Sequence, residues 1–182
     1  NDYIQYVESG GKKDEKKTEE ISTEKIEKVE SRPLVLNAKK IDLNKLKRKE
    51  KLGSGLCADV FKVVDVETEN VFAAKVMKDV ILDDDKNSMK AIHLSREVSI
   101  LSQISHPAIM KFFGYSGTDF LNLCRPVILT EFIKNRSLED VLEIERSGFK
   151  ISFWNDTMKF ICIYGIASSM AYLHSQNIIH RD

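Results

Sequence analysis

The sequence predicts an α+β fold, in which a small antiparallel sheet with one large helix is followed by further helices. Two observations lead to this class. Between residues 47 and 77, runs rich in β-branched and aromatic residues alternate with short turns, as in a meander of strands. After residue 88 the apolar residues recur every three or four positions instead, as on the buried face of a helix.

Strands and helices are expected in a definite order along the chain. The strands lie around Leu52 and at 60–66, 71–77, 109–115 and 127–133. The helices lie at 88–105, 135–145 and 153–174. Pro107 ends the first helix, because the residue before a proline avoids helical backbone angles, and Ser152 is placed to cap the last helix. The buried stripe of that helix is expected to consist of Met158, Ile161, Gly165, Ile166, Met170 and Leu173.

The composition is that of one globular domain. The sequence has 182 residues, of which 42% are hydrophobic and 31% are charged, enough for a sizeable core. Lys plus Arg and Asp plus Glu both total 28, so no overall field attracts nucleic acid or an anionic membrane. No run of about 18 apolar residues occurs, and we therefore expect no membrane segment.

The cysteines and histidines do not form a metal or disulfide pattern. Cys57, Cys124 and Cys162 include no CxxC pair, which argues against a disulfide framework and against a zinc site. No two histidines lie four residues apart, so side-chain metal ligation is not expected either. These features favour a reducing, cytoplasmic location.

Residues 1–45 are expected to form a charged, disordered amino-terminal segment outside the domain. Charges of both signs crowd residues 8–33, which leaves too few apolar residues for a buried face. A short helix that docks through Ile26 and Val29 is the alternative. The chain begins with Asn1 rather than Met, so we expect residues before this start to be missing.

A glycine-rich turn lies between the first two strands, in the stretch LGSGLCADV at 52–60. Glycines there allow the backbone to approach a ligand, and N–H groups that point inward can hold phosphate oxygens. The alternative is a plain tight hairpin. A dinucleotide-binding loop is excluded, because a strand rather than a helix follows the glycines.

Two charged residues occupy positions that are otherwise apolar. Lys75 interrupts the apolar strand at 71–77, where a lysine is costly to bury unless an anion pairs with it. Glu97 is the natural partner, because it shares a helix with the core-facing Val98 and Leu101. The alternative is an edge strand, in which the stem of Lys75 is buried and its amine lies in water.

The chain ends on His180, Arg181 and Asp182. With the glycine turn at 53, the strand lysine at 75 and the helix glutamate at 97, this triplet gives four motifs whose order and spacing resemble those of the eukaryotic protein kinases over 46–182. LGSGLCADV resembles the nucleotide-covering loop, FAAK the strand with the phosphate-binding lysine, REVSIL the first large helix, and IIHRD the opening of the catalytic loop. The resemblance implies a five-stranded antiparallel small lobe with one large helix at 46–133, then the first helices of an incomplete large lobe at 134–182.

The resemblance also implies roles for individual residues. Lys75 would pair with the α- and β-phosphates of ATP and be held by Glu97 when the helix is swung in. Asp182 would act as the catalytic base, while His180 would pack in the core and brace the catalytic loop. The implied nucleotide contacts are Leu52, Gly53, Ser54, Gly55, Leu56, Cys57, Ala58, Asp59, Val60, Ala73, Lys75, Thr130, Glu131 and Ile133.

Three of these contacts have more specific expectations. The backbone of Glu131 and Ile133 would form hydrogen bonds with the edge of the adenine. Thr130, which precedes them in the sequence, matches the gatekeeper position. The sequence departs from the family pattern at Ala58, which replaces the third glycine, and at Phe72, which replaces the usual valine. Neither departure removes a group that takes part in the chemistry.

The implied activity is ATP-dependent phosphoryl transfer, with ATP, Mg²⁺ and protein substrates as cofactors and partners. The family's Mg²⁺ ligands follow the catalytic base and are expected beyond the end of this chain, so the isolated chain is expected to bind nucleotide at best. The stretch GIASSMAYLHSQNIIHRD is most similar to the tyrosine-kinase-like (TKL) group, whose members mostly phosphorylate serine or threonine. A tyrosine kinase and a non-catalytic, pseudokinase-like binding fragment are the alternatives.

Overall fold

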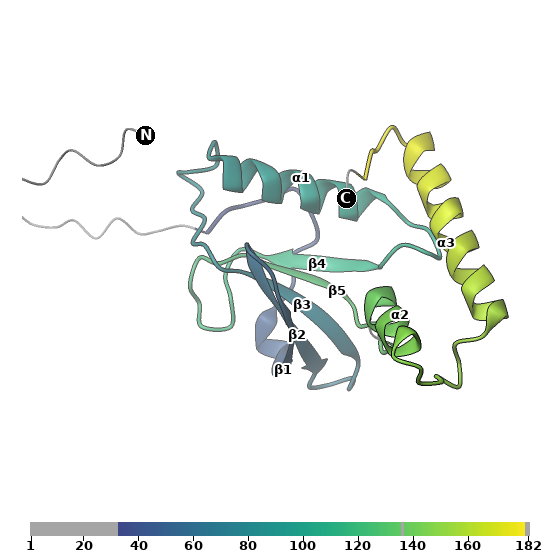
Figure 1. The fold of residues 1–182 in the computed structure, drawn as a ribbon. Helices are drawn as coiled ribbons and strands as arrows, with labels where there is room; N and C mark the ends of the chain where they lie inside the picture. Colours follow the sequence, from purple (N-terminus) through teal and green to yellow (C-terminus); the bar gives the residue numbers. More distant parts are fainter. Residues whose placement is uncertain (1–32, 136, 181–182) are drawn as a thin grey trace, which may run out of the picture. The chain divides into compact units, whose positions relative to one another are not determined.

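A computed structural model describes residues 33–135 and 137–180 of the chain. These residues form a five-stranded antiparallel sheet with helix α1 beside it, followed by helices α2 and α3 (Figure 1). The strands are β1 (Leu46–Ser54), β2 (Ala58–Asp65), β3 (Val71–Met77), β4 (Phe112–Ser116) and β5 (Val127–Glu131). The helices are η1, a 3₁₀ turn (Leu43–Lys45), α1 (Met89–Gln103), α2 (Leu138–Arg146) and α3 (Asp156–Ser175). The expected α+β fold is confirmed.

The sheet has the strand order β1-β2-β3-β5-β4. Strand β3 is therefore paired on both sides, and the alternative that Lys75 lies on an edge strand is wrong. Val60 lies opposite Lys75, and Ala73 lies opposite Thr130. Because directly opposed residues of antiparallel strands point to the same face, these four side chains share one face of the sheet.

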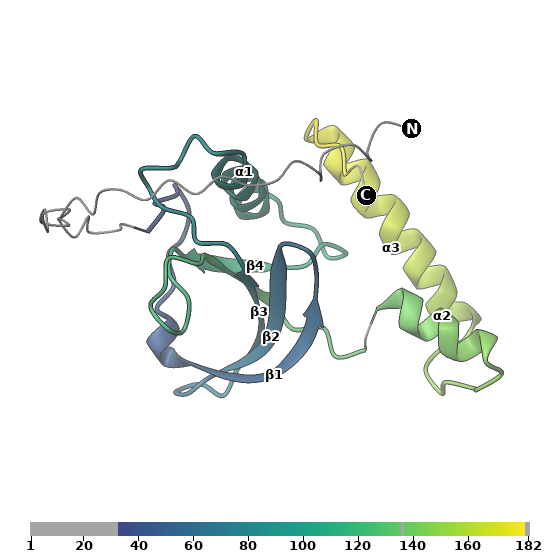
Figure 2. The same ribbon diagram turned by 60° about the vertical axis from the view of Figure 1, so that its left-hand side comes forward.

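Each face of the sheet has its own core. Helix α1 buries Ala91, Leu94 and Val98, and these pack with residues of the sheet and its connections on one face (Figure 2). The other members of this first core are Leu34, Ala58, Met77, Ile81, Tyr115 and Ile128. The core of the second face contains Leu46, Val63, Ala74, Val76, Val127 and Leu129. Lys75 lies on the face that α1 covers in part.

The capping residue Ser88 marks the start of helix α1, and Pro107 follows shortly after its end. The side chain of Ser88 accepts a hydrogen bond from the backbone N–H of Ala91, as an N-cap does. The helix ends before Ile104, three residues ahead of Pro107. The expected helix at 88–105 is confirmed to within two residues.

Helix α3 differs from the prediction in its cap and in its buried face. Asn155, rather than Ser152, is the N-cap and accepts a hydrogen bond from the N–H of Met158. Ser152 lies instead within a turn closed by the bond from Trp154 N–H to the Ile151 carbonyl. The helix therefore starts three residues later than Ser152 would have placed it.

Two residues of the expected stripe on α3 are exposed. Ile161 and Ile166 keep 53% and 55% of their surface, whereas Gly165 approaches the side chain of Ala108. Since the helix is apolar on nearly every side, its sequence pattern did not determine which side is buried. No helix in the described part of the chain is long and apolar enough to cross a membrane.

Residues 33–45, expected outside the domain, are part of it. Leu34 is buried in the first core with only 4% of its surface exposed, and Pro33 forms a β-bridge with Leu82. The amino-terminal boundary of the folded domain therefore precedes residue 46 by more than ten residues. The charged segment before Pro33 lies outside the described residues.

Candidate active site

The glycine-rich turn is a hairpin between β1 and β2. Ser54 lies opposite Asp59, and the N–H of Gly55 donates to the carbonyl of Ala58 over 2.8 Å. Leu56 is 95% exposed at the tip. A Cβ added at Gly53 would meet nothing within 4 Å, so the packing of the protein itself does not require glycine there. The space beside this backbone is open to a ligand.

A polar cluster closes the base of the hairpin. The Ser54 hydroxyl donates to the Asp59 carboxylate over 2.6 Å, and Lys51 and Lys78 approach the same carboxylate at 3.0 and 3.5 Å. The Ser54 hydrogen bond, with the Lys51 hydrogen bond second, lowers the pKa of Asp59 to about 2. Asp59 is thus ionised at neutral pH, and two ammonium groups flank the turn.

Lys75 and Glu97 form an ion pair between β3 and α1. The Lys75 Nζ lies 2.5 Å from Glu97 Oε1, and each side chain keeps 37% of its surface exposed. Lys75 comes from the central strand, next to Val60 at the end of the glycine turn. The structure therefore brings together the two charged residues that the sequence singled out, and it leaves part of both side chains exposed.

The wall behind this face is small and apolar. Ala73 and Thr130 are buried, and the Thr130 hydroxyl donates weakly to the Ala73 carbonyl over 3.5 Å. Leu52, at the other end of the expected nucleotide contacts, is 44% exposed. Ala73 and Thr130 lie opposite each other and share the face of Val60 and Lys75.

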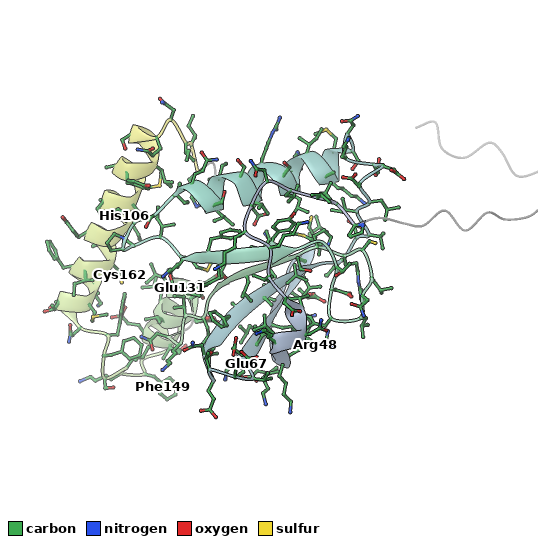
Figure 3. The ribbon with its side chains drawn as sticks, turned by 180° about the vertical axis from the view of Figure 1, so that it is seen from behind. Arg48, Glu67, His106, Glu131, Phe149 and Cys162 are labelled. Atoms are coloured by element: carbon green, nitrogen blue, oxygen red, sulfur yellow. The ribbon has the colours of Figure 1, made fainter. Side chains whose placement is uncertain are left out.

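Strand β5 ends at Glu131, labelled in Figure 3. Its N–H donates to the Lys111 carbonyl over 2.9 Å, and its carboxylate accepts from the Lys111 N–H over 2.8 Å. A ligand contact from the backbone of Glu131 would therefore use its carbonyl group. Ile133, two residues further on, is 55% exposed.

The expected catalytic end of the chain is described only in part. Arg181 and Asp182 lie outside the described residues. His180 is exposed, so the expectation that it packs in the core is wrong within the described structure. The chain leaves α3 through Asn177, which adopts a left-handed φ of 57°, and the described elements do not cover His180.

Sequence reasoning missed the role of Lys78 beside the glycine turn. Its ammonium donates to the Gly55 carbonyl over 2.7 Å, and its N–H donates to the Cys57 carbonyl over 3.0 Å. The pairing of Ala58 with Met77 brings it there. The predicted connection at 67–70 would pair residue 66 with residue 71, whereas the structure pairs Val64 with Val71, so the sequence pattern did not place Lys78 beside Cys57.

Comparison with known proteins agrees with this geometry. Residues 46–182 match the protein kinase domain family, and the chain therefore belongs to the protein kinases. It is 29% identical over 147 residues to the serine/threonine-protein kinase polo of Drosophila melanogaster, 29% over 133 residues to human Nek11, and 34% over 142 residues to STY46 of Arabidopsis thaliana.

These three matches cover most of this chain and little of each relative. They include 78%, 73% and 78% of the chain, in the same order, but only 23%, 20% and 22% of the relatives. The chain thus spans about a fifth to a quarter of their length. All three relatives are named as serine/threonine-protein kinases.

Proposed function

We propose that this protein binds ATP on the sheet face shared by Val60, Ala73 and Lys75 and transfers the γ-phosphoryl group to a serine or threonine hydroxyl of a protein. The observation that supports this most directly is the ion pair of Lys75 with Glu97 beside an open glycine turn. The names of the relatives support serine or threonine as the acceptor. We further propose membership of the TKL group and a cytoplasmic location.

The phosphate end of the site fits an anionic ligand. The side chain of Lys75 is partly exposed while Glu97 pairs with its ammonium, which fixes one positive charge next to the turn. Backbone N–H groups of the glycine turn are a second source of donors for phosphate oxygens. Fixed donors of this kind stabilise phosphoryl transfer because they need no reorganisation during the reaction.

The base end of the site fits a flat apolar group. Val60 and Ala73 offer apolar side chains on the shared face, and the carbonyl of Glu131 with the backbone of Ile133 is proposed to bond the edge of the adenine. Because its side chain is small, Thr130 leaves the space behind the adenine open. A bulkier side chain at this position would fill the space behind the adenine.

Bound ATP supplies the phosphoryl group, and protein kinases in general use Mg²⁺ with it. Asp182 is proposed to accept or orient the proton of the substrate hydroxyl. Lys75, held in place by Glu97, is proposed to bind the phosphates so that the transferred group faces that hydroxyl. The chain's own contribution is therefore to bind and orient the nucleotide and to place the base.

The test is nucleotide binding by calorimetry, with the chain of 182 residues and its Lys75→Met variant. Loss of a charge-assisted hydrogen bond costs about 1.5–3 kcal/mol, so ATP affinity should fall about 10- to 100-fold. Lys90→Met is the matched control, because Lys90 forms an exposed ion pair with Asp79 outside the site. Equal affinities of the wild type and Lys75→Met would contradict the proposal.

The acceptor residue is tested with the full-length protein. Peptide libraries that differ only in serine, threonine or tyrosine at the acceptor position should be phosphorylated on serine or threonine. Transfer to tyrosine alone would contradict the proposed specificity. Nucleotide binding without transfer to any library would instead support the non-catalytic alternative.

A further inference from the structure

Residues 33–42, here called the strap, lie ahead of the part that matches the kinase family and pack on the domain. Their exposure alternates as in an extended chain: Leu34 is buried and Leu36 and Ala38 are half-buried, whereas Val35 and Asn37 are exposed. One side of the strap therefore faces the domain. Figure 3 shows the strap from behind, running from the side of α1 past β4 to η1.

Tyr115 of β4 fastens the strap with four hydrogen bonds. Its hydroxyl accepts from the Leu36 N–H over 2.5 Å and donates to the Leu36 carbonyl over 2.9 Å. Its backbone accepts from the Ile41 N–H and donates to the Lys39 carbonyl, both over 2.9 Å. Only 1% of Tyr115 is exposed, so these bonds are shielded from water and hold the strap in one register.

Two glycines make room for the strap. A Cβ at Gly114 would lie 2.6 Å from both the Ile41 side chain and the Lys39 carbonyl oxygen, and one at Gly117 would lie 2.9 Å from the Leu34 carbonyl oxygen. Distances below 3 Å are not tolerated against backbone. The domain surface is thus shaped to receive this segment.

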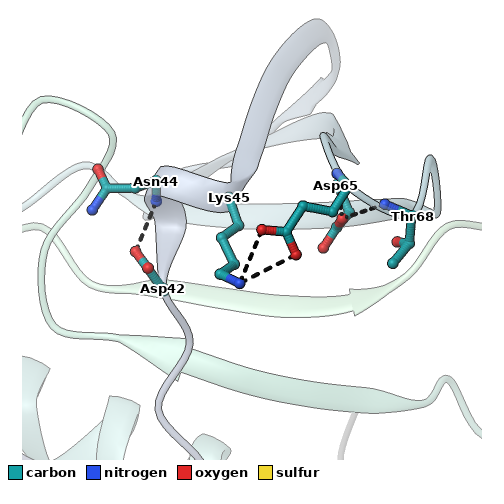
Figure 4. Close-up of polar contacts among 6 residues, drawn as sticks. Asp42, Asn44, Lys45, Asp65 and Thr68 are labelled. Atoms are coloured by element: carbon teal, nitrogen blue, oxygen red, sulfur yellow. Dashed lines mark hydrogen bonds and ion pairs between the residues drawn. The ribbon is translucent and has the colours of Figure 1, made fainter.

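The far end of the strap is anchored at the turn between β2 and β3 (Figure 4). Asp42 accepts from the Asn44 N–H at the start of η1, and the Lys45 ammonium lies 3.1 and 3.2 Å from the two carboxylate oxygens of Glu67. The hydrogen bond from Glu67 and its charge raise the pKa of Lys45. The pair is exposed and adds little stability, but it connects the chain just after the strap to the turn between β2 and β3.

Leu34 links the strap to α1. It belongs to the same buried core as Ala91, Leu94 and Val98, the three buried residues of that helix. Val98 directly follows Glu97, the partner of Lys75. The core in which α1 is buried therefore contains residues of the sheet, of its connections and of the strap.

We propose that the strap is a positioning element of the nucleotide site: Leu34 and the bonds of Tyr115 hold α1 where Glu97 reaches Lys75. Release of the strap removes part of the surface against which α1 packs and frees Glu97 from Lys75. The inference rests on the proposed function for its effect on ATP, but its effect on α1 does not. The two are therefore tested separately.

The first experiment measures hydrogen–deuterium exchange of α1 without nucleotide, in Leu34→Ala and in the neighbouring control Val35→Ala. Exchange across 89–103 should be about tenfold faster in Leu34→Ala than in the control, and Leu34→Ile should restore most of the protection. Equal exchange in Leu34→Ala and Val35→Ala would overturn the proposal. If Leu34→Ala does not fold, Tyr115→Phe replaces it, because it keeps the ring and removes only the bonds to Leu36.

The second experiment is a double-mutant cycle on ATP affinity with Leu34→Ala and Glu97→Gln. Leu34→Ala alone should weaken binding about three- to tenfold, and it should have no further effect in the Glu97→Gln background, because its action passes through Glu97. Independent, multiplying losses would show a merely structural role and overturn the proposal. If the wild type binds no ATP, the proposed function fails while the exchange experiment still decides the role of the strap.

Discussion

Lys78 donates a hydrogen bond of 2.7 Å from its ammonium to the carbonyl oxygen of Gly55. The same ammonium lies 3.3 Å from the Ser54 hydroxyl and 3.5 Å from the Asp59 carboxylate. Lys78, the first residue after β3, thus contacts both sides of the glycine turn. Since β3 also carries Lys75, the turn and the proposed phosphate-binding lysine are tied to the same strand.

Removal of this tether should loosen the turn. In Lys78→Met, backbone amides at 55–59 should exchange faster by up to about fivefold, because an exposed charged contact contributes about 1 kcal/mol at most. Hydrogen–deuterium exchange measures this change, and Lys90→Met, which removes another exposed ion pair, is the control. Unchanged exchange at 55–59 would show that the turn is held by its own backbone bonds.

The hairpin should also give the protein a specific sensitivity to acid. Asp59 has a folded-state pKa of about 2 against an ordinary value of 3.8, so its ionised form favours the folded state above about pH 4. This contribution is lost as the pH falls from about 4 to about 2. In this range Asp59 is already protonated in the unfolded state but still ionised in the folded state, so added protons favour unfolding. The difference in unfolding free energy between wild type and Asp59→Asn should therefore be constant above pH 4 and shrink below it. A difference that is constant down to pH 2 would contradict the role of the carboxylate.

The sheet and α1 were predictable because local chemistry decides them. Alternating apolar residues set the strands, Ser88 caps α1, and the motif order of Lys75 and Glu97 identified two residues that do meet in the structure. The roles assigned to these two residues stay proposals. Their contact follows from strand and helix patterns that need no knowledge of distant segments.

The remaining features depend on tertiary contacts. The alternation of Leu34, Leu36 and Ala38 is visible in the sequence, but so short a run beside a charged segment gives no sign of burial until Tyr115 and α1 are in place. The orientation of α3 is similarly undetermined by its nearly uniform apolar sequence. The exposure of His180 depends on which elements cover it, which no local pattern reports.

Asp119 should be a major contributor to stability in the loop before β5. It is only 3% exposed, its Oδ2 lies 2.5 Å from Arg125, and its Oδ1 accepts from the N–H groups of Leu121 and Leu123. Asp119→Ala would leave these donors unpaired, and we expect a loss of about 2–4 kcal/mol in urea unfolding. Asp84→Ala, at an exposed loop position, should change stability by less than about 0.5 kcal/mol. A loss of that small size in Asp119→Ala would contradict the role of the carboxylate.

Helix α3 should make the 182-residue chain associate in solution. Its exposed apolar side chains are Phe160, Ile161, Ile163, Tyr164 and Ile166, each with more than half of its surface in contact with water. Contiguous apolar surface of this kind favours association. Gel filtration should therefore give species larger than a monomer, and their fraction should rise with protein concentration. The double variant Phe160→Lys/Ile163→Lys should shift the chain toward a monomer, since it places two charges within this surface.

The control for α3 adds the same charge elsewhere. Asn87→Lys/Ser95→Lys changes two exposed polar positions outside α3 and raises the net charge equally. Association that both double variants suppress to the same degree would be due to net charge, and a sharp monomeric peak from the wild type would contradict the prediction outright. Suppression by the α3 variant alone would locate the associating surface on this helix, because only that variant interrupts its apolar side chains.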